Sequence, residues 1–122
     1  MANISDAEWV LLDLLWTKGP LTIMQIVKLL ETSKHWSKHA VISFLNKMEM
    51  KGLVASHVEE RAKIYSPLID KTDTAVKESV SFIDKVFHGN MGVMVSNLVE
   101  QDKLSDEEIE ELMDILSRKK ER

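Results

Sequence analysis

The sequence has 122 residues, of which 44% are hydrophobic, and carries a formal net charge of −4. This length fits one domain, or one small domain with an accessory element, and the composition excludes a globally disordered chain. Cysteine is absent, which excludes disulfides, a thiol nucleophile and thiolate metal clusters.

Four segments carry the residues that start helices. In a capping box, a Ser or Thr precedes the first helical residue, a Glu or Gln follows three positions later, and flanking apolar residues pack across the first turn. The segments "ISDAEW" (4–9), "LTIMQI" (21–26) and "LSDEEI" (104–109) have this full pattern. The segment "WSKHAV" (36–41) has the cap and the apolar pair but lacks the acidic partner. We therefore expect helices to begin after residues 5, 22, 37 and 105.

Residues 1–70 show three helical patterns followed by two strand patterns. Helices are expected at about 6–17, 23–31 and 38–50, and the third has an apolar side formed by Val41, Phe44, Leu45 and Met48. After it, "LVASHV" and "KIYSPLI" resemble strands around the polar turn "EERA". The predicted fold class is mainly α with a small β-hairpin wing: a winged helix-turn-helix over 1–70, followed by a C-terminal helical region.

Residues 71–122 have a purely helical pattern. Apolar residues recur at helical spacing in three rows: Val76, Val80, Ile83 and Phe87; Met91, Met94, Val95 and Leu98; and Ile109, Leu112, Met113 and Leu116. These helices are too short and too thinly apolar to form a core alone, and exposed rows of this kind usually contact a partner. A twofold dimer is the usual homo-oligomer, so we expect a dimerisation domain over 71–122. The alternative is that these helices fold back on the first domain.

The net negative charge of the chain arises entirely from its second half. Residues 1–70 contain eight Lys or Arg and eight Asp or Glu, whereas residues 71–122 contain eight and twelve. Charges are screened beyond about 8–10 Å at ordinary salt. A local basic face in the first half can therefore still bind phosphates.

The third helix of a winged helix-turn-helix contacts the DNA major groove, so its outer side supplies the candidate base contacts. If Val41, Phe44, Leu45 and Met48 face inward, the outer residues are Lys38, His39, Ile42, Ser43 and Asn46. Lys38 and His39 can donate to guanine or phosphate, Asn46 can pair with adenine, Ser43 can bond to either base, and Ile42 can contact a thymine methyl. Candidate phosphate contacts are Thr22 with the backbone N–H groups behind it, Lys47, Lys51, Arg61 and Lys63. The alternatives are that Ile42 is a scattered surface apolar residue and that the charges on the wing are only solvated.

No pattern in the sequence predicts catalysis, a cofactor or a metal site. His35 and His39 are four residues apart, but the N-cap at Ser37 places His35 before the helix, and no third ligand is near. There is no phosphate loop, His/Ser/Asp constellation or isolated carboxylate pair. We therefore expect a protein that is not an enzyme. Because no signal-peptide pattern or membrane-spanning run is found, we also expect a cytoplasmic protein without membrane insertion.

In order and spacing, these segments resemble the BlaI/MecI family of penicillinase and methicillin-resistance repressors, which is related to the CopY copper repressors. "ISDAEWVLLDLLW" is similar to the first helix of that family, and "WSKHAVISFLNKMEMKG" to the segment with its recognition helix. "RAKIYSPL" resembles the return strand of its wing, and "LSDEEIEELMDIL" its last helix. The resemblance implies a domain that binds double-stranded DNA, a homodimer, and repression of genes beside a palindromic operator, often built on TACA/TGTA elements.

The resemblance also implies a route of inactivation. In the antibiotic-resistance members, a membrane sensor with a zinc protease domain detects β-lactam, and the repressor is cut between Asn and an apolar residue in the dimerisation region. Asn97-Leu98 matches that place, with Leu where those members have Phe. The usual Thr-(Val/Ile)-Arg/x-Thr-Leu pattern is replaced by a segment with Ala40, Ile42 and Ser43, so the operator can differ. The cysteine cluster of the copper repressors is absent, which excludes release by copper through that cluster.

The sequence therefore predicts a dimeric transcriptional repressor. The main alternative is a winged-helix module that binds protein rather than DNA, which the weak basic face and Ile42 would suit. A third hypothesis is a metal-responsive regulator that uses His and carboxylates.

Overall fold

The computed structural model describes residues 3–121 and divides the chain into two compact units. The first unit ends at Ala75 and the second begins at Val76. The sequence placed the boundary between residues 70 and 71, at the start of helix α4 (Lys71–Phe87). The first turn of α4 therefore belongs to the first unit.

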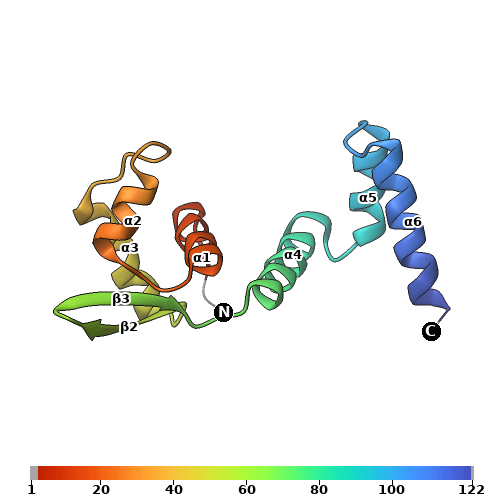
Figure 1. Ribbon diagram of the computed structural model, residues 1–122. Helices are drawn as coiled ribbons and strands as arrows, with labels where there is room; N and C mark the ends of the chain where they lie inside the picture. Colours follow the sequence, from red (N-terminus) through yellow and green to blue (C-terminus); the bar gives the residue numbers. More distant parts are fainter. Residues whose placement is uncertain (1–2, 122) are drawn as a thin grey trace. The chain divides into compact units, whose positions relative to one another are not determined.

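The first unit has the element order of a winged helix-turn-helix, as predicted (Figure 1). Its elements are α1 (Asp6–Lys18), β1 (Leu21–Thr22), α2 (Ile23–Leu30), α3 (Lys38–Met50), β2 (Val54–Glu59) and β3 (Ala62–Pro67). The prediction of two strands was incomplete, because β1 pairs antiparallel with β3 in a sheet of order β1-β3-β2. A strand of two residues is too short to show an alternating pattern, which explains why the sequence did not reveal it.

The predicted capping boxes all form. The hydroxyls of Ser5, Thr22 and Ser105 each accept a bond from the backbone N–H three residues later, and the Glu or Gln at that position accepts one from the cap backbone. Ser37 accepts only from the N–H of Ala40, since it lacks an acidic partner. These caps fix the start of α1, α2, α3 and α6 (Asp106–Lys120) at the residues that the sequence indicated.

A single apolar core holds the first unit together. Its buried members are Leu11, Leu12, Leu15, Leu21, Ile26, Leu30, Val41, Leu45, Met48, Leu53, Val54 and Tyr65. The predicted inner side of α3 is confirmed, since Val41, Leu45 and Met48 are buried. Phe44 is half-buried, and its ring lies 5.0 Å from that of Trp36, centroid to centroid. This packing determines which side of α3 faces outward.

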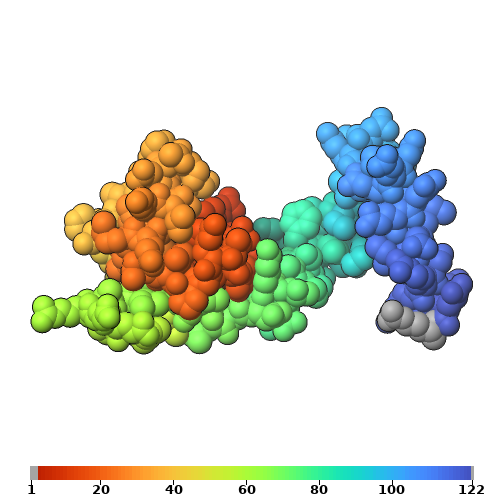
Figure 2. Space-filling model, in the orientation of Figure 1, coloured from red at the N-terminus to blue at the C-terminus, as the bar shows by residue number. Residues whose placement is uncertain are grey.

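The wing is a hairpin with a two-residue turn. Strand pairing continues to Glu59 and Ala62, which leaves Glu60 and Arg61 at the tip. Both have positive φ, 48° and 70° respectively, as the tightest hairpin turn requires. That region is costly for residues other than glycine. The hairpin extends beyond the helices of the first unit as a narrow projection (Figure 2).

The second unit contains most of α4, then α5 (Met91–Glu100) and α6. Neither α5 nor α6 buries a residue. Within residues 3–121, every pair of helices or strands with extensive contacts belongs to the first unit. No helix in the described part of the chain is long and apolar enough to cross a membrane.

Candidate nucleic-acid interface

The outer face of α3 carries the residues that the sequence assigned to base contacts. Lys38, His39, Ser43 and Asn46 are exposed, and Ile42 is half-buried. The spacing of His39, Ser43 and Asn46 places them on one side of the helix, opposite the buried Val41, Leu45 and Met48. The face thus presents donors, acceptors and one partly exposed apolar group, which is the mixture that recognises base edges.

Met50 extends this face at its C-terminal end. Met50 was not among the predicted contacts, yet its side chain is 88% exposed. It follows Asn46 by four positions, so the two residues lie on the same side of α3. Helical spacing places Met50 on this face. It was not predicted as a contact because its side chain is apolar.

The start of α2 offers backbone donors rather than a side chain. The Thr22 hydroxyl already accepts from the Gln25 N–H at 3.2 Å, and the Thr22 N–H donates to the Gln25 side chain at 2.8 Å. The cap thus uses both the hydroxyl and the backbone N–H of Thr22. The N–H groups that follow it lie at the positive end of the helix, where a phosphate can bind.

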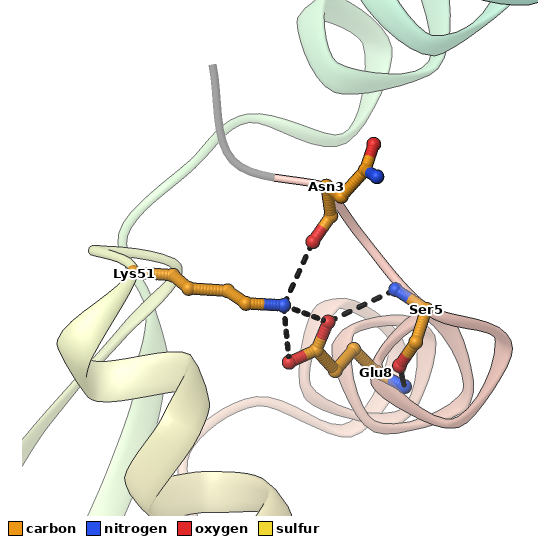
Figure 3. A network of polar contacts seen from close by, with 4 residues as sticks. All are labelled: Asn3, Ser5, Glu8 and Lys51. Atoms are coloured by element: carbon orange, nitrogen blue, oxygen red, sulfur yellow. Dashed lines mark hydrogen bonds and ion pairs between the residues drawn. The ribbon is translucent and has the colours of Figure 1, made fainter.

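Lys51 does not belong with the phosphate contacts to which the sequence assigned it. Its ammonium group donates to both carboxylate oxygens of Glu8, at 2.7 and 3.0 Å, and to the backbone oxygen of Asn3 at 2.8 Å (Figure 3). An ammonium has three N–H donors, and all three are used here. Lys51 therefore joins the end of α3 to the start of α1. It has no free N–H donor left for a phosphate.

The ion pair changes the acidity of Glu8, which is 2% exposed. Burial by itself raises the pKa of this carboxyl, but hydrogen bonds from Lys51 and the Ser5 backbone and the charge of Lys51 outweigh it, so the pKa is lowered. Glu8 is thus held as a carboxylate inside the first unit. Sequence periodicity alone could not pair it with a residue 43 positions away.

Three candidate cations remain: Lys47, which is exposed on α3, and two on the wing. Arg61 is exposed at the tip, and Lys63 is exposed on β3 with its ammonium 5.5 Å from the centre of the Tyr65 ring. The Lys63 ammonium also lies 3.5 Å from Oε1 of Glu49. Tyr65 first, and then Glu49, raise the pKa of Lys63 above its usual range, so this side chain stays charged.

Glu49 connects α3 to the wing, a contact that was not predicted from the sequence. Its Oε2 accepts a hydrogen bond from the Ser56 hydroxyl on β2 at 3.0 Å, while its Oε1 faces Lys63 on β3. Helical spacing shows that Glu49 lies near the boundary of the buried side of α3. It does not show which strand lies opposite, so no signal in the sequence points to this contact.

The proposed dimerisation residues differ in exposure. Ile83 is buried within the chain, which removes it from the surface that a partner can contact. Phe87, Met94 and Ile109 are half-buried, and the other predicted residues are exposed: Val76, Val80, Met91, Val95, Leu98, Leu112, Met113 and Leu116. The prediction of three narrow rows missed further exposed apolar side chains, namely Phe82, Val86, Val93, Val99 and Ile115. The apolar surface is therefore wider than the periodicity indicated.

The expected cleavage position lies within α5. Asn97 and Leu98 are both exposed. Their backbone oxygens accept hydrogen bonds from Gln101 at 3.1 Å and Lys103 at 2.9 Å. The bond between them is thus held in helical geometry in this structure. Among residues 3–121 there is no group of three or more His, Asp or Glu side chains arranged to hold a metal ion.

The sequence as a whole matches a known family. The family model described as "Penicillinase repressor" matches residues 4–118. The chain belongs to this family. It is 34% identical over 120 residues to the penicillinase repressor of Bacillus licheniformis, covering 98% of this chain and 94% of that protein. It is 32% identical to the methicillin resistance regulatory protein MecI of Staphylococcus aureus strain N315, covering 96% of this chain and 95% of that protein.

Solved structures of this family resemble the chain as well. The solution structure of the DNA binding domain of the repressor BlaI has a TM-score of 0.52 and 29% identity, and the match covers 60% of this chain and 93% of that one. The monomeric form of Bacillus licheniformis BlaI in complex with the blaP half-operator has the same TM-score and identity, and the match covers 59% and 88%. The predicted winged helix-turn-helix is thus confirmed at the level of fold.

Proposed function

We propose that this member of the penicillinase repressor family is a transcriptional repressor that binds a palindromic DNA operator as a homodimer. The observation that carries the proposal is the exposed polar face of α3, on a fold similar to that of a BlaI monomer solved with its half-operator. A helix with its apolar side buried and donors and acceptors on the other side fits the major groove.

Each group of this interface has a distinct role in the proposed complex. Asn46 and Ser43 contact base edges, and the exposed part of Ile42 contacts a thymine methyl. Lys38, His39 and Lys47 on α3 contact bases or phosphates, while Arg61 and Lys63 on the wing and the start of α2 behind Thr22 contact phosphates. Phosphate contacts orient the protein without reading sequence, so specificity rests on a few residues of α3.

The exposed apolar surface of the second unit supports the dimer. Leu116, Met113 and Met91 are 66%, 62% and 55% exposed in the single chain, and a large amount of exposed apolar surface is usually covered by a partner. A second copy of the chain suits a palindromic operator, because a twofold axis in the protein then coincides with one in the DNA. Linking two half-sites in this way can raise affinity by about 10²–10⁴-fold.

Fluorescence anisotropy with two labelled duplexes tests the DNA proposal. One duplex carries a TACA/TGTA palindrome, and the other is a scrambled sequence of the same composition. We expect tighter binding to the palindrome and a steep fall of affinity with salt on both. Lys38→Ala should weaken binding to both duplexes and reduce the salt dependence. Asn46→Ala should cost about 1–3 kcal/mol on the palindrome alone. If affinity is independent of salt and unchanged in both variants, the protein-binding alternative is favoured.

We further propose that a membrane sensor protease inactivates the repressor by cutting between Asn97 and Leu98. The cut would separate α6 and the end of α5 from the rest of the dimerisation surface. Because the bond is in a helix, cleavage requires local unfolding, which is cheap in a segment that buries no residue. Mass spectrometry of the protein from cells grown with and without β-lactam tests this. Full-length protein together with derepressed target genes would exclude the mechanism.

A further inference from the structure

Three residues at the junction of α3 and the wing form a fixed polar cluster. Glu49 stands near the end of α3, Ser56 on β2 and Lys63 on β3. The Ser56 hydroxyl donates to Oε2 of Glu49 at 3.0 Å, and the Lys63 ammonium lies 3.5 Å from Oε1. The hydrogen bond from Ser56 restrains the carboxylate, so its other oxygen stays directed at Lys63.

The cluster places a negative charge beside a cation that is proposed to bind phosphate. The side chains of Lys63 and Glu49 are 46% and 32% exposed, so both can be approached by a polyanion. A phosphate that contacts Lys63 comes well within one screening length, about 8–10 Å at ordinary salt, of the Glu49 carboxylate. Attraction by the lysine is therefore largely cancelled by repulsion from the glutamate. Part of the electrostatic affinity of the wing is lost in this way.

We infer that Glu49 is a positioning residue that competes with DNA phosphate for Lys63 and thereby limits the sequence-independent affinity of the protein for DNA. This inference rests on the proposed function. In physical terms, the Glu49 carboxylate and the Lys63 ammonium together present almost no net charge to the DNA. Arg61 at the tip of the wing and Lys38 at the start of α3 then supply more of the phosphate attraction than Lys63 does.

This limit on DNA affinity should apply equally to every DNA sequence. Phosphate contacts do not depend on base sequence, so removing the Glu49 charge should tighten binding to a palindromic and to a scrambled duplex by a similar factor. A repressor whose non-specific affinity is lower spends less time on the many competing genomic sites. Base recognition by Asn46 and Ser43 is not expected to change.

The test is a double-mutant cycle on the full chain with Glu49→Gln and Lys63→Met. Glutamine keeps the acceptor for Ser56 and removes only the charge, so the fold should be preserved, as circular dichroism can check. We expect Glu49→Gln to tighten binding to both duplexes by about two- to fivefold at low salt, the size of an exposed ion pair. The slope of log affinity against log salt should steepen by up to about 0.9, as for one added phosphate contact. In the Lys63→Met background, Glu49→Gln should have a smaller effect, because only the direct repulsion between the carboxylate and the phosphate remains.

Glu59→Gln is the matched control. Glu59 is an exposed carboxylate on the same wing that lies 3.3 Å from His57 rather than beside a lysine. Its removal should change affinity by the same small factor with Lys63 present or absent. For Glu49→Gln, weaker binding, or a gain that persists fully without Lys63, would overturn the inference. If the unaltered protein binds neither duplex in a salt-dependent way, the proposed function itself fails, which is a separate result.

Discussion

Helices α1 and α6 begin with almost the same sequence, Ser-Asp-Ala-Glu and Ser-Asp-Glu-Glu, and both close the same capping box. Their surroundings are different. Helix α1 buries Glu8, Leu11, Leu12 and Leu15 in the core of the first unit, whereas α6 buries no residue. A capping pattern thus determines where a helix begins, but it carries no information about what the helix packs against.

The same contrast separates the two units. Within its described residues, the first unit buries one apolar core and presents the polar outer face of α3. It exposes fewer large apolar side chains than the second, namely Met24, Leu29, Met50, Val58 and Leu68. The second leaves many of its large apolar side chains exposed in the single chain, which is costly in water. From this comparison we expect the first unit to fold on its own contacts and the second, if the proposed dimer forms, to depend on another copy of the chain.

The largest effect is expected from deleting core atoms in the first unit. Leu45 is fully buried, so Leu45→Ala should lower the free energy of unfolding by about 2–5 kcal/mol. Leu112 is 39% exposed, so Leu112→Ala should have a much smaller effect at low protein concentration. Urea unfolding followed by circular dichroism suits the measurement, because helices of both units contribute to the signal. Equal losses in the two variants would contradict the comparison.

The next effect concerns assembly of the second unit. Leu116 is 66% exposed, so Leu116→Glu should leave a monomer intact but place a charge in the proposed dimer interface. Each substitution counts twice in a symmetric dimer, and we expect dimerisation to weaken by at least about tenfold, or about 1.4 kcal/mol. Light scattering over a concentration series measures this, with Leu116→Met as the apolar control. A monomeric unaltered chain at tens of micromolar would refute the dimer.

A third prediction compares the two glutamates of the matching capping boxes. The pKa of Glu8 is lowered against the effect of burial, and that of Glu108 is lowered by bonds from the Ser105 backbone and side chain. Glu8→Gln leaves Lys51 without its ionic partner and should lower the free energy of unfolding by about 1–2 kcal/mol at neutral pH. The loss is not larger because the Lys51 side chain is a third exposed, so solvent weakens the ion pair. Glu108 is fully exposed, so Glu108→Gln should cost less.

The lowered pKa of Glu8 also predicts how the stability of the protein changes with pH. Because the folded pKa lies below the unfolded one, the contribution of Glu8 is fully present above the ordinary pKa of a glutamate. It is lost as the pH falls through the folded value. Thermal unfolding between pH 7 and 3 should show a shallower acid loss for Glu8→Gln than for the unaltered chain. Parallel curves for the two proteins would contradict the role of the ion pair.

Much of the first unit could be predicted from sequence because its signals are local. Capping boxes, the apolar side of α3 and the hairpin are periodic or adjacent in the chain, and each forms as expected. The contacts that were missed join distant residues: Lys51 to Glu8, Glu49 to Lys63, and β1 to β3. Periodicity describes one element at a time. It therefore identified candidate phosphate contacts but could not show that Lys51 was already paired.

The second unit was predicted less completely for a related reason. Periodicity correctly placed three helices, but it assumed that each has one narrow apolar row. The structure buries Ile83 and exposes Phe82 and Val86 instead. Which apolar side chains remain free depends on how neighbouring helices and a partner cover them, and a single sequence does not contain that information.

The smallest expected effect concerns two of the non-glycine residues with positive φ, one taken from each unit. Arg61 has φ 70° at the tip of the wing, and Asp102 has φ 55° after α5. Glycine adopts this region freely, whereas arginine pays a steric cost and aspartate a smaller one. The Gly and Ala variants at a site both remove the side chain, so their difference isolates this backbone cost. We expect Arg61→Gly to be more stable than Arg61→Ala by about 1 kcal/mol, and Asp102→Gly to be more stable than Asp102→Ala by a similar amount, because alanine meets the same steric cost at both sites. Urea unfolding followed by circular dichroism measures both pairs. DNA affinity should fall equally in the two Arg61 variants, because both lose the guanidinium that is proposed to contact phosphate. An Ala variant as stable as the Gly variant at either site would show that the positive φ there carries no steric cost.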